Sequence, residues 1–212
     1  MTSFLENLYE IIKRLMDIVL STLAIVILSP LYLLISYLIK LEGEGPIIYK
    51  QKRVGKGGKE FWIYKFRTMY ADAEERLNEL LEKYPDLRRE WEQRRKLKND
   101  PRITKIGKIL RRTSMDELPQ FWNVLKGDMS LVGPRPIVKE ELEKHYGDRA
   151  KHYTKVKPGI TGYWQVSMRN EHESYEDRVK MELWYIEHRS LWLDLKILLR
   201  TAQAVLKGHG AY

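Results

Sequence analysis

Two adjacent carboxylates, Asp116 and Glu117, lie where the sequence predicts the start of a helix. Pro119 follows them, and proline is tolerated only in the first turn of a helix, so we expect this helix to begin at or just before Asp116. Backbone N–H groups and the positive end of the helix dipole keep a carboxylate ionised there and attract phosphate. An ionised aspartate beside a bound phosphate is what an aspartyl-phosphate intermediate requires.

The same run also has a purely structural interpretation. Residues 114–117, Ser-Met-Asp-Glu, fit a capping box, and Asp116 could equally be an ordinary N-cap. Taken alone, these residues favour the cap, because capping boxes are common. The residues that follow favour chemistry: the Gly-Asp pair 127–128 predicts a turn, and the Pro-Arg-Pro run 134–136 restricts Arg135 in a way that suits bidentate phosphate binding.

An uncharged apolar run covers residues 18–39 and precedes this region. As a straight helix it would measure about 33 Å, enough to cross a bilayer core of about 30 Å. Pro30 lacks an N–H and clashes with the carbonyl of Val26, which argues for a break near Ser29, whose hydroxyl could satisfy a freed carbonyl. Each half then reaches only the middle of a bilayer.

Charge supports the same interpretation. Basic residues flank both ends of the apolar run: Lys13, Arg14, Lys40, Lys50, Lys52 and Arg53. A spanning helix cannot satisfy the positive-inside rule at both ends, whereas a re-entrant helix-break-helix can. We therefore expect a monotopic segment that enters and leaves a membrane on its cytoplasmic face, with a kinked spanning helix as the alternative.

The remaining sequence predicts an α+β fold that is mainly helical, with a re-entrant hairpin over 1–41 and a cytoplasm-facing catalytic domain over 42–212. A glycine-rich turn at 54–59 joins two strand-like runs into a small β-hairpin. Helices are expected over 71–99, with a break at Pro85, and from 137 to about 153. Two further helices, over 103–112 and 191–206, are expected to be amphipathic and to lie at the membrane interface or in the core. A short strand is expected over 163–166.

Composition limits the possible partners. The chain has 212 residues, no cysteine, and 38 basic against 29 acidic residues, for a net charge of +9. This length allows one domain with a substantial core, and the charge suits anionic partners without choosing among nucleotide, nucleic acid and acidic lipid. The absence of cysteine rules out disulfides and thiolate metal sites.

Several long motifs occur in one order from Lys13 to the C-terminus: KRLMDIVLS, YKFRTM, DPRITKIGKILRRTSMDELPQFWNVLKGDMSLVGPRP, VKPGITGYWQV and SLWLDLK. In these motifs the chain resembles the polyprenol-phosphate phosphoglycosyl transferases of the monotopic, bacterial sugar transferase type. The segments VLKGHGAY and TGYWQVSMRN are most similar to the undecaprenyl-phosphate galactose phosphotransferases within that family.

The resemblance implies transfer of a hexose 1-phosphate from a UDP-sugar to undecaprenyl phosphate, with release of UMP, as the first step of O-antigen, capsule or exopolysaccharide assembly. Galactose is the expected sugar and glucose the alternative. Asp116 would be the nucleophile, Glu117 its partner, and Mg²⁺ the cofactor held by both. A direct glycosyl transfer that releases UDP, or a membrane-anchored basic binding module, remains as a competing hypothesis; we expect no nucleic-acid partner, and a homo-oligomer is possible.

Phosphate and nucleotide ligands are expected among the basic residues near these motifs. Lys65 and Arg67 alternate with aromatic residues and should share one face of a strand. The resemblance places Arg67 near the active site and favours Arg111 as a phosphate ligand, with Arg135 as a third cation. The resemblance alone supports Arg169 and Asn170 as contacts to nucleotide or sugar.

Overall fold

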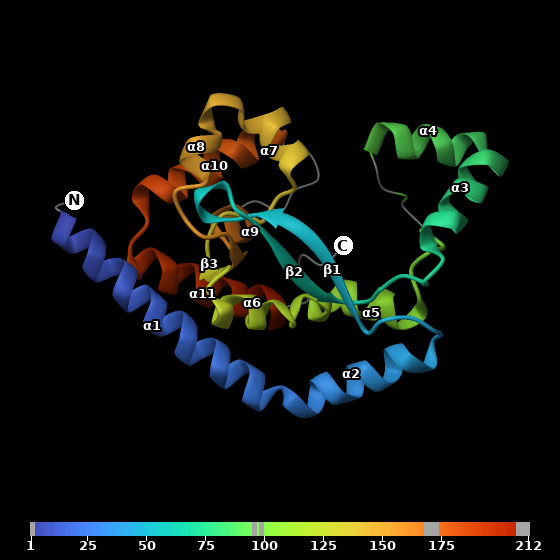
Figure 1. The fold of residues 1–212 in the computed structure, drawn as a ribbon, viewed down its shortest axis with the longest axis horizontal. Coiled ribbons are helices and arrows are strands. Elements are labelled where there is room, and N and C mark those ends of the chain that lie inside the picture. Colours follow the sequence, from blue (N-terminus) through green and yellow to red (C-terminus); the bar gives the residue numbers. More distant parts are fainter. Residues whose placement is uncertain (1–2, 95–96, 98–99, 168–173, 207–212) are drawn as a thin grey trace.

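A bent pair of helices runs along one side of the molecule in the computed structural model, which describes residues 3–94, 97, 100–167 and 174–206 (Figure 1). Helix α1 (Ser3–Ile27) and helix α2 (Ser29–Leu41) meet at an angle of 60°. Taken singly, none of the described helices has both the length and the hydropathy to cross a membrane, whereas this bent pair has both when taken together.

The break lies at the predicted position. Pro30 occupies the first turn of α2, where its missing N–H costs no hydrogen bond. The Ser29 hydroxyl donates to the carbonyl of Val26 at 2.8 Å. The predicted break at Ser29 and Pro30, and the predicted role of the serine, are therefore confirmed.

The rest of the chain is mainly helical with two small sheets, which confirms the predicted mainly helical α+β architecture with a small β-hairpin. Strands β1 (Ile48–Val54) and β2 (Glu60–Phe66) form the predicted antiparallel hairpin, and β3 (Ser130–Val132) pairs in parallel with β4 (Gly159–Thr161). The helices that follow the hairpin are α3 (Ala73–Lys83), α4 (Pro85–Arg94), α5 (Lys105–Thr113), α6 (Gln120–Lys126), α7 (Lys139–Tyr146), α8 (Ala150–Tyr153), α9 (Tyr163–Ser167), α10 (Tyr175–His188) and α11 (Leu191–Leu206).

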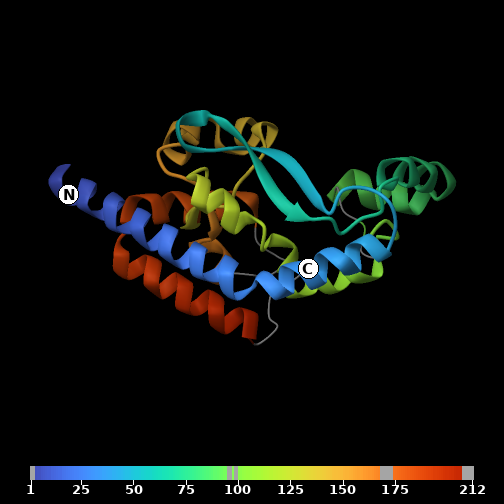
Figure 2. The same cartoon turned by 60° about the horizontal axis from the view of Figure 1, so that its bottom comes forward.

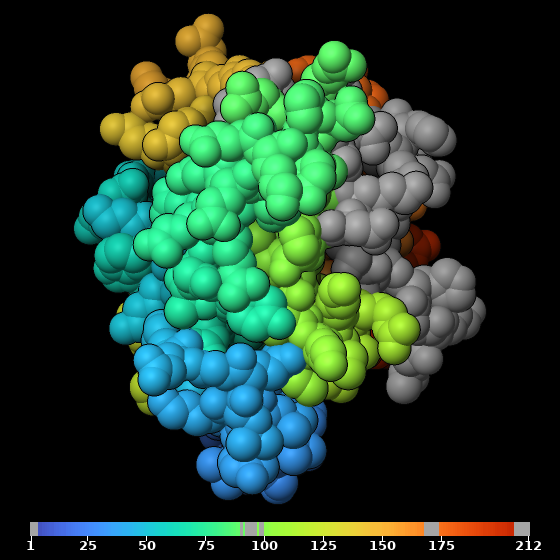
Figure 3. All heavy atoms as spheres, turned by 90° about the vertical axis from the view of Figure 1, so that its right-hand side faces the viewer, coloured from blue at the N-terminus to red at the C-terminus, as the bar shows by residue number. Residues whose placement is uncertain are grey.

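Helices α3 and α4 form an arm that extends away from the body (Figure 1). They are separated at Tyr84, directly before Pro85, as the proline predicts. Both helices are rich in charged residues, and most of their described side chains are exposed to solvent, as this composition predicts. In the side view of Figure 3 the arm covers the upper front of the molecule above α2.

The prediction of a strand over 163–166 is wrong, because these residues form helix α9. The strand in this region is β4, which ends at Thr161 before the helix begins. A Cβ atom at Gly159 would lie 2.1 Å from the backbone nitrogen of Gly133. Glycine therefore permits the close approach of two backbone segments, while Val166 N–H bonds the carbonyl of Gly162 at 3.3 Å in the helix that follows.

Two hydrophobic clusters include residues of β2 and of the helices and strands packed against it. The first joins β2, α6, β3, α10 and α11 through Ile63, Val124, Met129, Val132, Tyr185 and Ile197, among others. The second joins α2 to β2 and α5 through Ile35, Ile39, Phe66 and Leu110, with Met115 and Leu118 packed against it. Helix α2 therefore packs against the segment 115–118 through this cluster.

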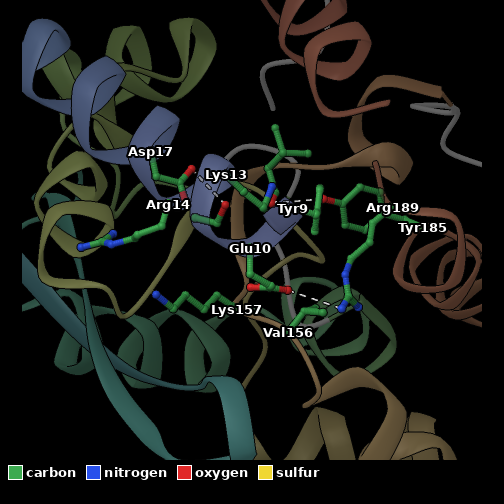
Figure 4. A pocket seen from close by; sticks show the side chains of 11 residues that line it. Tyr9, Glu10, Lys13, Arg14, Asp17, Val156, Lys157, Tyr185 and Arg189 are labelled. Atoms are coloured by element: carbon green, nitrogen blue, oxygen red, sulfur yellow. Dashed lines mark hydrogen bonds and ion pairs between the residues drawn. The ribbon is translucent and has the colours of Figure 1, made fainter. Parts of the chain in front are cut away.

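Helix α1 is bound to the body through buried polar contacts. The Asp194 carboxylate is fully buried and accepts hydrogen bonds from the Tyr9 hydroxyl at 2.9 Å, from the Lys13 ammonium at 2.6 Å and from the Tyr185 hydroxyl at 2.6 Å. Asp17 accepts from the backbone N–H of Leu131 at 2.9 Å. Figure 4 looks into the small cavity, of about 30 Å³, beside these contacts.

We expect Asp194→Asn to lower the free energy of unfolding by about 3 kcal/mol, because it leaves the partly buried Lys13 ammonium without its anionic partner. Chemical unfolding in detergent micelles, followed by circular dichroism, measures this loss. Glu143→Gln is the control, since that carboxylate lies 3.9 Å from Lys139 on an exposed face. Equal stability of the two variants would show that the α1–α11 contact contributes little.

Candidate active site

The acidic pair lies in a 3₁₀ turn, η2 (Met115–Glu117), between α5 and α6. Ser114 ends α5 in the left-handed conformation, with φ of 56°, and within the described chain its side chain makes no capping bond. The capping-box interpretation is therefore wrong. The predicted α-helix also begins later than expected, at Gln120, directly after Pro119.

The two carboxylates converge on one cation, Lys65 of β2. The Lys65 ammonium lies 2.6 Å from Glu117 Oε1 and 3.9 Å from Asp116 Oδ2. Successive residues of a helix point about 100° apart, so adjacent carboxylates do not converge by themselves. A lysine from a neighbouring strand brings the charges together, which unites Lys65, Asp116 and Glu117 in one site.

The environment separates the pKa values of the two acids. Asp116 is 13% exposed, and burial, together with the neighbouring charge of Glu117, raises the pKa of its carboxyl despite the opposing charges of Lys65 and Arg111. Burial also acts to raise the pKa of Glu117, but Lys65, Arg135 and a hydrogen bond from Gln120 outweigh it, so this pKa lies below its ordinary value. Paired carboxyl groups with opposite shifts are typical of sites where each acid has a separate role.

The positive charges of two predicted arginines, Arg111 and Arg135, act on this acidic pair. Arg111 donates through Nε to the Thr68 hydroxyl at 2.9 Å, and its positive charge acts on Asp116. Arg135 acts on Glu117 and is held through its backbone. The Arg135 carbonyl accepts from the Tyr153 hydroxyl at 2.8 Å, and its N–H donates to a Glu182 oxygen at 3.2 Å.

The structure gives Arg67 partners other than phosphate. This residue is 9% exposed, and its guanidinium donates to the carbonyls of Ile39, Gly43 and Glu44. It follows the last residue of β2, so the alternation that placed it beside Lys65 does not continue. Arg67 thus anchors the end of α2. Arg169 and Asn170, predicted as substrate contacts, lie outside the described residues.

Sequence reasoning missed two residues that hold the site in place. The Tyr32 hydroxyl of α2 donates to the carbonyl of Leu118, and its ring packs 5.6 Å from that of Phe66. These partners directly follow Glu117 and Lys65. Asn123 of α6 accepts from the N–H of Tyr64 at 3.0 Å and donates to the carbonyl of Trp62 at 2.7 Å. Neither residue carries a sequence signal, because the contacts join segments far apart in the chain.

A third missed residue is Arg178 of α10. It is 9% exposed, and its Nε lies 3.1 Å from Glu182 Oε1. Its guanidinium carbon lies 5.0 Å from the ring centre of Trp164, while that of Arg135 lies 5.9 Å from the same ring. Trp164 therefore connects Arg178 to the arginine that acts on Glu117. A charged residue on a buried helix face was the available signal.

The comparison with known proteins decides the family. The sequence model of the bacterial sugar transferase family matches residues 8–208. The chain belongs to the bacterial sugar transferase family. It is 52% identical over 201 residues to the undecaprenyl-phosphate galactose phosphotransferase of Salmonella typhimurium, covering 95% of this chain and 42% of that protein.

Two further relatives differ in length and in name. The exopolysaccharide production protein ExoY of Rhizobium meliloti is 44% identical over 94% of this chain and 88% of its own length. The UDP-glucose:undecaprenyl-phosphate glucose-1-phosphate transferase of Xanthomonas campestris is 39% identical over 98% of this chain and 41% of its own length. This chain thus spans about two fifths of the length of several curated relatives and most of the length of others.

We expect Lys65→Met to raise the pKa of both Asp116 and Glu117, because the ammonium is the foremost charge that favours each ionised carboxylate. Carboxyl ¹³C NMR titration of micelle-bound protein labelled at aspartate and glutamate measures the shifts. Lys126→Met is the control, since Lys126 pairs with Asp128 at 3.1 Å instead. Unchanged titration of both acids in Lys65→Met would contradict the assigned electrostatics.

Proposed function

We propose that this chain transfers a hexose 1-phosphate, galactose 1-phosphate in the first place, from a UDP-sugar to undecaprenyl phosphate and releases UMP. The observation that carries the proposal is the convergence of Asp116 and Glu117 on Lys65. Arg111 and Arg135 add positive charge on either side, which suits a reaction between two phosphate-bearing anions. The names of the relatives support the same class of reaction.

Asp116 is the better candidate for the nucleophile. Glu117 is bound by Lys65 at 2.6 Å and has a lowered pKa, so its electron pairs are strongly stabilised. Asp116 is held more loosely, at 3.9 Å, and burial raises its pKa. A carboxylate of higher pKa is the stronger nucleophile once it is ionised. Glu117 then keeps Lys65 in place and positions its neighbour.

In the proposed reaction an Asp116 oxygen forms a bond to the β-phosphorus of the UDP-sugar. The bond from that phosphorus to the oxygen bridging to UMP breaks, and UMP leaves with the electron pair. An oxygen of the lipid phosphate then attacks the same phosphorus and frees the Asp116 carboxylate. Lys65, Arg111 and Arg135 stabilise negative charge in both steps. No net oxidation or proton transfer is required of the chain.

The acidic pair also fits Mg²⁺. Among the described residues there is no group of three or more His, Cys, Asp or Glu side chains placed to hold a metal ion. Mg²⁺, however, commonly binds through one or two carboxylates together with substrate phosphate oxygens and water. Asp116 and Glu117 already direct oxygens at one cationic centre, the Lys65 ammonium. When bound there, Mg²⁺ would neutralise charge on the diphosphate.

We further propose that α1 and α2 insert as a re-entrant hairpin on the cytoplasmic face of a bacterial inner membrane. Large apolar side chains are exposed along both helices, among them Leu15, Val19, Leu23, Ile27, Leu33 and Leu34. Helix α11 runs alongside α1 in Figure 2 and also exposes apolar residues, Trp192, Leu195 and Leu199. Together these surfaces support docking into lipid, which would bring the site to the depth of a lipid phosphate.

The identity of the sugar divides the relatives. The name of one specifies galactose and that of another specifies glucose, at 52% and 39% identity respectively. Galactose is our first choice and glucose the second candidate. Parallel assays with UDP-galactose and UDP-glucose under one set of lipid and Mg²⁺ concentrations decide between them by the ratio of kcat/KM.

We expect Asp116→Asn to abolish both turnover and the covalent adduct, and Glu117→Gln to retain a trace of activity. The amide of asparagine cannot attack phosphorus, whereas Glu117 only positions. UMP and UDP are resolved after incubation of detergent-solubilised protein with UDP-galactose, undecaprenyl phosphate and Mg²⁺, and the adduct is sought by intact mass spectrometry. Glu143→Gln serves as the exposed-carboxylate control.

The outcomes separate the hypotheses. Lipid-dependent UMP supports phosphosugar transfer, UDP indicates direct glycosyl transfer, and wild-type activity in Asp116→Asn overturns the assignment of the nucleophile. If neither nucleotide is released with UDP-galactose or UDP-glucose, the proposed reaction is wrong for these donors.

The rate of UMP release should fall as pH is lowered. Asp116 must be ionised to attack, its ionised fraction decreases as pH falls through its pKa, and burial raises that pKa above its ordinary value. Because kcat/KM reports the free enzyme, before Mg²⁺ and donor bind, its acid limb is therefore expected at a higher pH than the ordinary aspartate value of about 3.9. Circular dichroism over the same range controls for acid unfolding. A rate that stays constant down to that value would contradict a raised pKa.

A further inference from the structure

Three buried hydrogen-bond donors near Arg178 have no partner among the described residues. They are Arg178 Nη2, Trp164 Nε1 and the Tyr175 hydroxyl. A buried polar group without a partner costs about 1 to 3 kcal/mol, and such groups are rare in folded proteins. Three of them in one neighbourhood therefore require an explanation beyond packing.

Two of the three groups belong to aromatic side chains that lie beside the guanidinium of Arg178, which carries the third. The central carbon of Arg178 lies 5.0 Å from the ring centre of Trp164 and 4.9 Å from that of Tyr175. The Tyr175 ring is in turn stacked on His145 at 3.7 Å. We call Trp164, Tyr175 and Arg178 the donor cluster. Its side chains come from α9 and α10, on either side of a segment outside the described residues.

Glu182 accounts for one side of Arg178. Its carboxylate accepts from Arg178 Nε at 3.1 Å, from the Arg135 N–H at 3.2 Å and from the Tyr146 hydroxyl. Glu182 thus fixes Arg178 and Arg135 relative to each other. It leaves Arg178 Nη2 available for another acceptor.

The chemistry of the donor cluster selects its ligand. Arginine, the indole N–H and a protonated tyrosine all donate, and burial raises the pKa of Tyr175 to about 12, so its hydroxyl keeps its proton at neutral pH. A site that offers only donors and a positive charge fits a ligand that is anionic and rich in hydrogen-bond acceptors. A nucleoside diphosphate sugar presents such acceptors at its base, phosphates and hydroxyl groups.

The donor cluster is also joined to the acidic pair. Arg135 acts on Glu117 and lies 5.9 Å from the ring of Trp164, the ring that Arg178 also contacts. A substrate whose β-phosphate lies at Asp116 would extend past Arg135 toward this cluster. In Figure 1, α10 lies on the opposite side of the body from α2, which favours the nucleotide sugar over a lipid phosphate.

We propose that Trp164, Tyr175 and Arg178 bind the UDP-sugar donor through hydrogen bonds to the part of it that lies beyond the reacting phosphate. This inference rests on the proposed function and adds a substrate-binding subsite to it. The uracil and the hexose share the required acceptor chemistry, and the test below distinguishes them.

Tyr175→Phe tests the subsite with one atom removed. If the hydroxyl is only structural, its loss is neutral or slightly stabilising, because an unpartnered buried group disappears. If it binds the donor, the Kd and KM for UDP-galactose rise about 5- to 20-fold while kcat and the KM for undecaprenyl phosphate stay unchanged. Tyr49→Phe, at an exposed tyrosine of β1, is the matched control.

Binding is measured by calorimetry in the Asp116→Asn background, so that it does not depend on turnover. UDP-galactose, UMP and galactose 1-phosphate are titrated separately. Weaker UMP binding in Tyr175→Phe assigns the cluster to the uridine end, and weaker galactose 1-phosphate binding assigns it to the sugar end. Arg178→Lys, which keeps the charge beside Glu182, should reproduce the loss with a melting temperature close to that of the parent.

The results separate this inference from the proposed function. If the parent binds UDP-galactose and wild-type protein releases UMP, but Tyr175→Phe and Arg178→Lys bind as tightly as the parent, the subsite is wrong and the reaction stands. If the parent binds no UDP-sugar and wild-type protein releases no UMP, both are overturned.

Discussion

The site depends on a lysine placed between two carboxylates that are adjacent in sequence. Without the Lys65 ammonium, Asp116 and Glu117 would repel each other in a partly buried turn, and desolvation would raise both pKa values. The cation lies closer to Glu117, so it stabilises the charge of this residue more strongly. The resulting asymmetry is the basis for the roles we propose, with Glu117 as the charge-holding residue and Asp116 as the reactive one.

Long-range contacts bring that lysine and those acids together. Asn123 fixes β2 to α6 through backbone groups of Trp62 and Tyr64, which places the strand bearing Lys65 beside the turn. Tyr32 reaches from α2 to the residue after Glu117. The position of the acids therefore depends on α2. The apolar helix pair thus supports the site, in addition to the membrane contact that we propose for it, and positions the proposed catalytic residues.

Sequence predicted what local physics determines. The break at Ser29 and Pro30, the β1–β2 hairpin and α11 follow from proline, glycine and hydrophobic period, and all three are confirmed. Two predictions were wrong: Ser114 ends α5 in the left-handed conformation instead of capping the next helix, and residues 163–166 are helical. The strand lies at Gly159–Thr161 instead, where glycine permits a close approach to the backbone of Gly133. Long-range partners such as Tyr32 and Arg178 leave no periodic signal.

The arginines show why partners are more informative than motif position. Arg67 lies in a motif that suggested phosphate, yet three backbone carbonyls accept from its guanidinium, so its donors serve the end of α2. Arg178 lay in no candidate motif, yet one buried nitrogen has no acceptor among the described residues. An arginine whose hydrogen bonds are satisfied by its own chain is a structural element. One that is fixed by an ion pair and still has a buried donor to offer is arranged for a ligand.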